Sequence, residues 1–475
     1  MSGGVRPDEE DILIPALQAP RDETEEIPAL VEPHINTGVS HAWRALRHRN
    51  FRLFFGGQSI SLIGSWMTLV ATRWLVYRLT GSALLLGTVG FVGQIPSFLL
   101  APFAGVWMDR LDRRKVLLWT QTLSMIQSLL LAAMTLSGRI TIPWLLVLSA
   151  MQGIINAFDM PGRQAFMVEM LEDRRDLSNA IAINSSMVNA TRLIGPSLAG
   201  ILIAATNEGW CFLIDGCSFI AVIASLYSMR LRVSTVMRIP TSTLAELKVG
   251  WTYVSESMPI RTILLLFALI SLMGMPFVVL MPIFAVQVLH GGPNTLGFLM
   301  GAMGIGALAS ALSLAARKSV VGLVRMIPIA AGVFGLGLIG FGLSHALWLS
   351  MIMALVAGIG MMQGMAASNT IIQTIVSEDK RGRVMSYYAM ALVGMAPFGS
   401  LLAGTMAHAI PSTPVWISSG SMLTGAQWTV IINGVVVLLG AMWFFTRLPA
   451  LRVVVRPIYQ EMGIIPAAQE MTAEQ

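Results

Sequence analysis

Four ionisable residues occur within long apolar stretches of this 475-residue chain, where a charge is costly to bury. Asp215 lies in "FLIDGCSF", Asp159 in "NAFDMPGRQAF", Arg192 in "NATRLIGPS" and Arg73 in "VATRWLVY". A buried carboxylate can take up and release a proton when its surroundings change, whereas a guanidinium stays charged and needs a partner or water. These residue types are therefore candidates for proton exchange or for holding a charged ligand.

The four candidates differ in what their neighbours predict. Asp215 is the best placed for proton exchange, whereas Asp159 stands beside Pro161 and Arg163, where a helix-end cap or a salt bridge is expected. Two interpretations of Arg192 stay open: a structural ion pair with Asp215, which we favour, or an anchor for an anionic group such as a carboxylate or catecholate. Arg73 is predicted nearer the outer surface, which its long side chain could reach.

Composition indicates the solvent around these residues. Hydrophobic residues make up 55% of the chain and charged residues 12%, with a mean hydropathy of +0.71, whereas a soluble domain is about 25% charged. Runs such as "TILLLFALISLMGMPFVVLMPIFAV", from Thr262, approach or exceed the about 20 residues that cross a bilayer. Because these runs lack the alternation of barrel strands, we predict an all-α membrane protein.

Twelve stretches are expected to span the membrane as two pseudo-symmetric bundles of six helices. The predicted spans are 53–78, 82–107, 115–137, 142–166, 179–205, 209–229, 262–288, 294–316, 322–343, 346–374, 384–409 and 424–445. The predicted regions are a disordered cytoplasmic tail (1–42), an N-terminal bundle (43–230), a cytoplasmic linker (231–261), a C-terminal bundle (262–446) and a cytoplasmic tail (447–475). Within the linker, "TLAELKVGWTYVSES" is compatible with a short surface helix.

Charge and repetition support this arrangement. Most of the 31 Lys and Arg residues fall at one set of alternating loops and helix ends, so the positive-inside rule predicts that both termini are cytoplasmic. "MQGIINAFDMPGRQAFMVEMLEDRR", from Met151, is echoed by "MQGMAASNTIIQTIVSEDKR", from Met362, and "GPSLAGILIA" by "FGSLLAGTMA" in the next helix of each half. Paired halves with a site between them are typical of secondary transporters.

The loop between the second and third spans, "GVWMDRLDRRK", resembles the signature G-x-x-x-D-R-x-G-R-R of the major facilitator superfamily. The matching residues are Gly105, Asp109, Arg110, Arg113 and Arg114. Asp112 replaces a glycine, which puts the tight turn of the motif in question. A carboxylate beside guanidinium groups predicts a conformational latch between the halves, and the alternative is a basic cytoplasmic loop with an incidental acid. The corresponding loop of the second half, "ARKSVVGLVR", lacks the acid.

The resemblance extends over residues 43–446. The phrases "WLVYRLTGSALLLG" and "DKRGRVMSYYAMALVGMAPFGSLLAG" look like the bacterial exporter branch that contains enterobactin exporters and macrolide efflux proteins. That resemblance implies a rocker-switch exporter, usually driven by proton entry. An acid often follows the first-span glycine in this branch, but here Gly64 precedes Ser65.

The fifth span contains a candidate helix-bend motif, Gly195, Pro196 and Gly200. In proton-coupled exporters of the superfamily, a G-P motif in this helix is associated with antiport, and this sequence resembles it only in part. Proline removes a backbone hydrogen bond and small residues let helices approach closely, so bending and close packing are both open interpretations.

We expect a secondary active transporter of the bacterial inner membrane that exports a small drug-like or siderophore-like amphipathic molecule, with protons as the coupling ion. The alternatives are an uptake carrier or uniporter and, from another class, a non-transporting receptor or scaffold. We expect no enzyme and no cofactor, because the sequence contains no nucleophile motif, metal-ligand cluster or phosphate loop. The expected partners are the substrate, protons and the lipid bilayer, and not nucleic acid.

Overall fold

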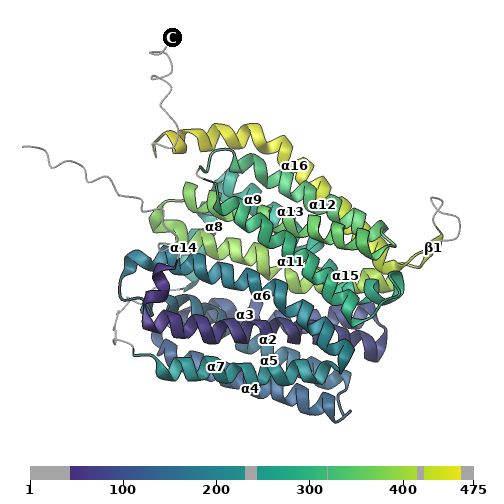
Figure 1. Ribbon diagram of the computed structural model, residues 1–475. Helices are drawn as coiled ribbons and strands as arrows, with labels where there is room; N and C mark the ends of the chain where they lie inside the picture. The colour runs from purple at the N-terminus through teal and green to yellow at the C-terminus, as the bar shows by residue number, and fades with distance from the viewer. Residues whose placement is uncertain (1–42, 231–242, 318, 415–421, 462–475) are drawn as a thin grey trace, which may run out of the picture. The chain divides into compact units, whose positions relative to one another are not determined.

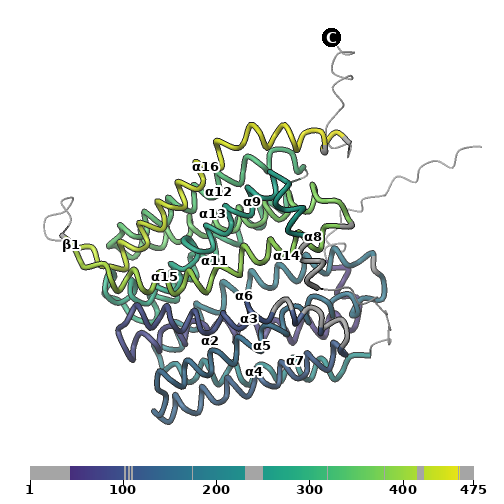
Figure 2. Tube along the Cα trace, turned by 180° about the vertical axis from the view of Figure 1, so that it is seen from behind, coloured from purple at the N-terminus to yellow at the C-terminus, as the bar shows by residue number. Residues whose placement is uncertain are grey.

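The computed structural model describes residues 43–230, 243–317, 319–414 and 422–461. Within them, 12 helices are long and apolar enough to cross a membrane (Figures 1 and 2). The predicted all-α membrane fold with twelve spans is confirmed. Beyond residue 446, the last helix continues to Glu461, so part of the predicted cytoplasmic tail is helical.

The N-terminal half contains six spans. They are α2 (Arg49–Thr80), α3 (Ala83–Arg110), α4 (Arg113–Leu136), α5 (Ile142–Glu169), α6 (Leu177–Ala205) and α7 (Glu208–Ser228), with short 3-10 turns η1 (Arg44–Arg47) and η2 (Arg174–Asp176). Two of the connections turn at glycines with a positive φ, Gly81 and Gly138, a conformation that costs glycine little.

Helix α8 (Thr243–Glu256) precedes the spans of the C-terminal half and agrees with the helix predicted in the linker. The next span is built from α9 (Met258–Leu269), η3 (Ile270–Gly274), α10 (Phe277–Ile283) and η4 (Phe284–Val288). The remaining elements are α11 (Pro293–Ala315), α12 (Leu323–Leu343), α13 (Leu347–Ile375), α14 (Glu378–Ala389), η5 (Met390–Gly394), α15 (Ala396–Ala409), the strands β1 (Thr413–Pro414) and β2 (Met422–Leu423), and α16 (Gly425–Glu461). The two strands form an antiparallel pair between α15 and α16.

Two spans of the C-terminal half contain π-helical turns, η3 and η4 in one and η5 in the other. Pro276 follows η3 and Pro397 follows η5, and neither proline can donate a backbone hydrogen bond. The turns η3 and η5 are joined, because the Ser271 hydroxyl donates to the Leu392 carbonyl at 2.6 Å.

We call the end of the bundle at which α2 and α4 begin the basic end, after Arg49, Arg113 and Arg114, and the opposite end the far end. The far end contains Gly81, Gly138 and the start of α7. The sequence predicts that the basic end is cytoplasmic.

The halves meet along two helix pairs, α6 with α11, which lie side by side in Figure 1, and α3 with α15. At Gly200 of α6, an added Cβ would lie 2.9 Å from the Gly297 Cα, and at Gly404 of α15 it would lie 2.8 Å from the Gly87 Cα. Gly200 and Gly404 are equivalent in the internal repeat "SLAG" and "LLAG", and both pairs lie toward the far end. The repeat thus brings the two halves into backbone contact on the far side, as small residues do in membrane helices.

The interiors of the halves differ. Packed phenylalanines fill the C-terminal half, with ring centroids 5.9 Å apart for Phe277 and Phe341 and 4.6 Å apart for Phe284 and Phe341. Both halves also bury polar side chains, and in the N-terminal half a set of them lies along α2 and α4: Gln58, Ser61, Thr120, Gln121, Ser124, Gln127 and Ser128. All the buried acids within described membrane spans, Asp159, Glu208 and Asp215, also lie in this half.

Candidate functional site

Asp215 lies on α7 and points toward α2 and α4. Its Oδ2 accepts hydrogen bonds from the Ser128 hydroxyl at 2.6 Å and the Thr68 hydroxyl at 2.8 Å, and its Oδ1 accepts one from the Ser65 hydroxyl at 3.3 Å. The residue is 3% exposed. None of the ion pairs among the described residues includes Asp215, so a carboxyl group is buried with hydroxyl donors and without a cation.

A glycine on α2 permits this arrangement. A Cβ at Gly64 would lie 2.8 Å from the Asp215 Oδ1 and 2.9 Å from its Cα, so only glycine lets the two helices approach this closely. The next residue is Ser65, where the family resemblance leads one to expect an acid. The carboxylate of Asp215 reaches this position from α7 instead, and Ser65 donates to it.

Arg192 does not pair with Asp215, so the favoured interpretation of an ion pair is wrong. Its guanidinium lies over the ring of Trp66, 5.3 Å from the ring centroid, and its buried Nε has no hydrogen-bond partner among the described residues. The physical reason is the position of α2: Ser65 and Thr68 are on its α7 side, whereas Trp66 is on its α6 side. The helix therefore separates the two charges.

Arg73 lies on the same face of α2 as Trp66, because the two residues are seven positions apart, about 10 Å along the helix axis. Its Nη1 donates to the Val278 carbonyl of α10 at 3.4 Å, so it contacts the other half of the protein. As with Arg192, no carboxylate among the described residues pairs with it. Two guanidinium groups therefore lie within the membrane spans without a counter-charge from the described part of the chain.

Asp159 of α5 forms an ion pair with Arg163, one helical turn further on, which agrees with the expected salt bridge. Its Oδ1 also accepts hydrogen bonds from the Gln121 amide at 2.6 Å and the Thr120 hydroxyl at 2.9 Å, both on α4. Asp159 is 4% exposed, so it is a second buried carboxylate, nearer the basic end than Asp215.

The signature loop joins the basic ends of several helices. Asp112, which replaces the glycine of the motif, has an extended backbone and caps α4 by accepting from the Lys115 amide at 3.2 Å, so the turn needs no glycine. Arg113 donates to Glu169 of α5 at 2.6 Å, and Arg114 to the Tyr227 carbonyl of α7 at 3.0 Å. The side chains of Asp109 and Arg110 and the surroundings of Gly105 lie outside the described part, and the latch remains a prediction.

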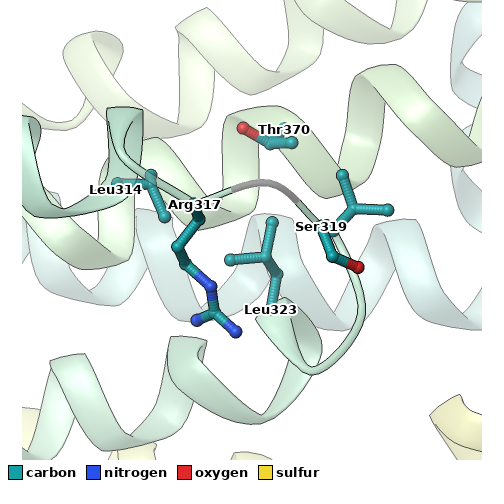
Figure 3. Close-up of a pocket in the computed structure, with 6 residues that line it drawn as sticks. Leu314, Arg317, Ser319, Leu323 and Thr370 are labelled. Atoms are coloured by element: carbon teal, nitrogen blue, oxygen red, sulfur yellow. The ribbon is translucent and has the colours of Figure 1, made fainter.

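The corresponding loop of the second half lies beside a cavity of about 130 Å³ between α11, α12 and α13 (Figure 3). The cavity is lined by Leu314, Arg317, Ser319, Val320, Leu323 and Thr370. Arg317 donates to the Val321 carbonyl at 3.3 Å, within its own loop. This volume is below the about 300 Å³ of a small-molecule site, so the cavity is not a candidate for substrate binding.

The helix-bend motif lies at two interfaces of α6. A Cβ on Gly195 would contact the Trp66 side chain of α2, whereas Gly200 faces α11. The helix continues through Pro196, from Leu177 to Ala205. Of the two open interpretations, these contacts favour close packing.

Two residues that donate hydroxyl hydrogen bonds to Asp215 were not predicted from the sequence: Thr68 and Ser128. A signal was present in "TQTLSMIQS", residues 120–128, where polar residues recur every three or four positions in an otherwise apolar helix. Such a pattern marks a helix face that is buried against polar partners, because lipid offers none.

Amide side chains are also exposed within the repeat-related helices α5 and α13. Gln152 donates to Asn156 at 3.0 Å on α5, and Gln373 donates to Asn369 at 3.1 Å on α13. Since hydrocarbon cannot satisfy an amide, this exposure favours contact with water.

Comparison with known proteins places this arrangement in a family. The chain matches the family described as transmembrane secretion effector over residues 40–445. It is 28% identical over 353 residues to the staphyloferrin A transporter of Staphylococcus aureus (74% of this chain, 88% of the relative). It is 26% identical to the multidrug efflux pump Tap of Mycolicibacterium fortuitum (73% of this chain, 86% of the relative).

Among solved structures, the fold resembles a bacterial homolog of the human lysosomal transporter Spinster in an inward-facing, unoccupied conformation. The TM-score is 0.61 and the identity 15%, over 87% of this chain and 98% of that structure. Since the relatives are membrane transporters and not enzymes, and the fold is that of the major facilitator superfamily, the chain belongs to the transmembrane secretion effector family of these transporters.

Proposed function

We propose that this protein exports a small amphipathic molecule across the bacterial inner membrane in exchange for protons, by alternating access to a central site. The observation that carries the proposal is Asp215, a buried carboxyl group with three hydroxyl neighbours and no cation among the described residues. In a low-dielectric interior, gain or loss of its proton changes the local charge by a full unit, which is the requirement for coupling.

Helix α2 provides the connection between proton and substrate. One side of this helix contacts Asp215 through Ser65 and Thr68, and another side presents Trp66 and Arg73 toward α6 and α10. A change in the charge of Asp215 alters its bonds to α2, and α2 transmits this change to the interface between the halves.

Arg192 and Arg73 support an acidic substrate. Each is a guanidinium without a carboxylate partner among the described residues, and Arg192 also retains an unpaired, buried Nε. A carboxylate or catecholate would supply the missing charge through charge-assisted hydrogen bonds, and Trp66 adds an apolar surface. The names of the relatives, a siderophore transporter and a drug efflux pump, are compatible with such a molecule.

The far-end contacts of Gly200 and Gly404 support an assignment of this conformation as closed at the far end. With the basic end cytoplasmic, as the distribution of Lys and Arg predicts, this is the state that receives substrate from the cytoplasm. Export then requires these contacts to separate and the basic end to close.

The proposal is tested with purified protein in liposomes across which a pH gradient is imposed. The probes are a catecholate siderophore-type anion, a macrolide and the tetraphenylphosphonium cation. The expected result is uphill movement of the anion that is driven by the gradient and lost in Asp215→Asn. Movement of the anion without any dependence on the gradient would instead identify a uniporter.

A further inference from the structure

We propose that Asp215 exchanges its proton with the basic end through a file of buried hydroxyl and amide groups on α4, inside the N-terminal half and apart from the substrate route. This inference rests on the proposed function. The file consists of Thr120, Gln121, Ser124, Gln127 and Ser128, each at most 5% exposed. Their spacing of three or four residues places them on one face of α4, which packs against α5 and α7.

Both ends of the file hold a carboxylate. At one end Ser128 donates to Asp215 at 2.6 Å, and at the other Gln121 donates to Asp159 at 2.6 Å and Thr120 at 2.9 Å. Ser128 is eight positions after Thr120, which is about 12 Å along the helix axis and a substantial part of the about 30 Å hydrocarbon core. A direct transfer over 12 Å is not possible, so intermediate donors and acceptors are needed.

The middle of the file contains such groups. The hydroxyl of Ser124, one turn from both Gln121 and Ser128, accepts a hydrogen bond from the Gln152 amide at 3.3 Å. On α4, the Gln121 Oε1 is buried and has no protein partner among the described residues. On α2, which contacts Asp215 through Ser65 and Thr68, the same holds for both amide atoms of Gln58 and for the Ser61 hydroxyl. Buried polar atoms of this kind are normally bonded to ordered water, and water between hydroxyl groups completes a path for protons.

The path opens toward the basic end. Asp159 is paired with Arg163, whose side chain is 26% exposed, so the proposed path leaves the buried interior there. In the other direction Asp215 is followed by Cys211 and Phe212, both fully buried, and the next acid on α7 is Glu208, about 10 Å away and paired with Arg78. In this conformation, exchange with the far end is therefore blocked by apolar packing.

The C-terminal half offers no equivalent route. Its interior contains packed phenylalanines and separate buried polar residues such as Gln427 and Asn433, but no buried acid occurs in its described spans. Arg192 of α6 and Arg73 of α2 lie on other sides of α2 from the side that contacts Asp215. The proton thus moves within one half, while the substrate moves between the halves.

The test follows hydrogen exchange at Asp215 itself and needs no substrate. The full chain in lipid nanodiscs is mixed rapidly with D2O, and the infrared C=O band of the protonated carboxyl group, identified by its loss in Asp215→Asn, is followed over time. The mixing is done at an acidic pH at which this band is fully developed. The test variant is the double substitution Gln121→Leu/Ser124→Ala.

The expected result is exchange about tenfold slower in the double variant, equivalent to about 1.4 kcal/mol on the barrier. Two controls are expected to exchange at the wild-type rate: Ser124→Thr, which keeps the hydroxyl, and Ser225→Ala, which removes a hydroxyl that donates to the Ala221 carbonyl of its own helix. Wild-type exchange in the double variant would overturn the inference. Slowed exchange in a protein that transports none of the probes would leave the inference intact and contradict the proposed function instead.

Discussion

The glycine contacts between the halves lead to a prediction of conformational bias. In Gly200→Ala, the new Cβ would lie 2.8 Å from the Pro293 carbonyl oxygen and 2.9 Å from the Gly297 Cα, and in Gly404→Ala it would lie 2.7 Å from the Ala83 carbonyl oxygen. These neighbours are backbone atoms, so relief requires α6 to move from α11, or α15 from α3. Either movement opens the far end.

The magnitude follows from the cost of overpacking, about 1–3 kcal/mol per site. If this cost falls only on the closed arrangement, each substitution raises the ratio of far-end-open to far-end-closed protein about 5- to 150-fold. The two sites lie in different helix pairs, so their effects should add in the double variant.

The assay measures a distance across the far end by spin labelling. Labels on Ser137→Cys in the N-terminal half and His345→Cys in the C-terminal half, both exposed, report the separation of the halves after Cys217 and Cys211 are replaced. The matched control is Gly56→Ala, where nothing lies within 4 Å of the added Cβ. Unchanged distance distributions in both Gly200→Ala and Gly404→Ala would refute the assignment of these glycines to the closed far end.

Three further predictions concern stability and binding. Burial raises the pKa of the Asp176 carboxyl group, but hydrogen bonds from His48 and Arg44 outweigh burial and leave this pKa below its usual value. The ionised carboxylate therefore stabilises the fold, and Asp176→Asn should lower the melting temperature at neutral pH. The difference in melting temperature from wild type should vanish as the pH falls through the pKa of Asp176. Arg192→Gln should weaken binding of a catecholate anion about tenfold or more in a calorimetric titration, with no effect on tetraphenylphosphonium; equal loss for both probes would argue against a charge contact. Phe341→Ala should lower the free energy of unfolding by about 3–5 kcal/mol, because it removes a ring packed against Phe277 and Phe284, and a loss below 1 kcal/mol would contradict this packing.

The fold was predictable from the sequence because the bilayer restricts the backbone to so few arrangements. Apolar length located twelve spans, and the repeat at Met151 and Met362 identified the two halves. The π-helical turns within the seventh span were not predicted, because such turns depend on tertiary packing such as the hydrogen bond from the Ser271 hydroxyl to the Leu392 carbonyl.

The site was predictable only in part. An acid in an apolar stretch identified Asp215, but its partners Thr68 and Ser128 depend on the rotation of α2 and α4, which one sequence does not determine. The same uncertainty produced the incorrect pairing of Arg192 with Asp215, since α2 lies between them.

The central claim is that Asp215 exchanges protons for substrate, and the most direct test is a count of protons per substrate molecule. Liposomes containing the protein and a pH-sensitive dye receive a gradient of the catecholate anion without an imposed pH gradient. We predict proton movement opposite to the anion in wild type and in Glu256→Gln, an exposed acid on α8, and none in Asp215→Asn. Anion transport without proton movement in wild type, or proton movement that persists in Asp215→Asn, would contradict the account.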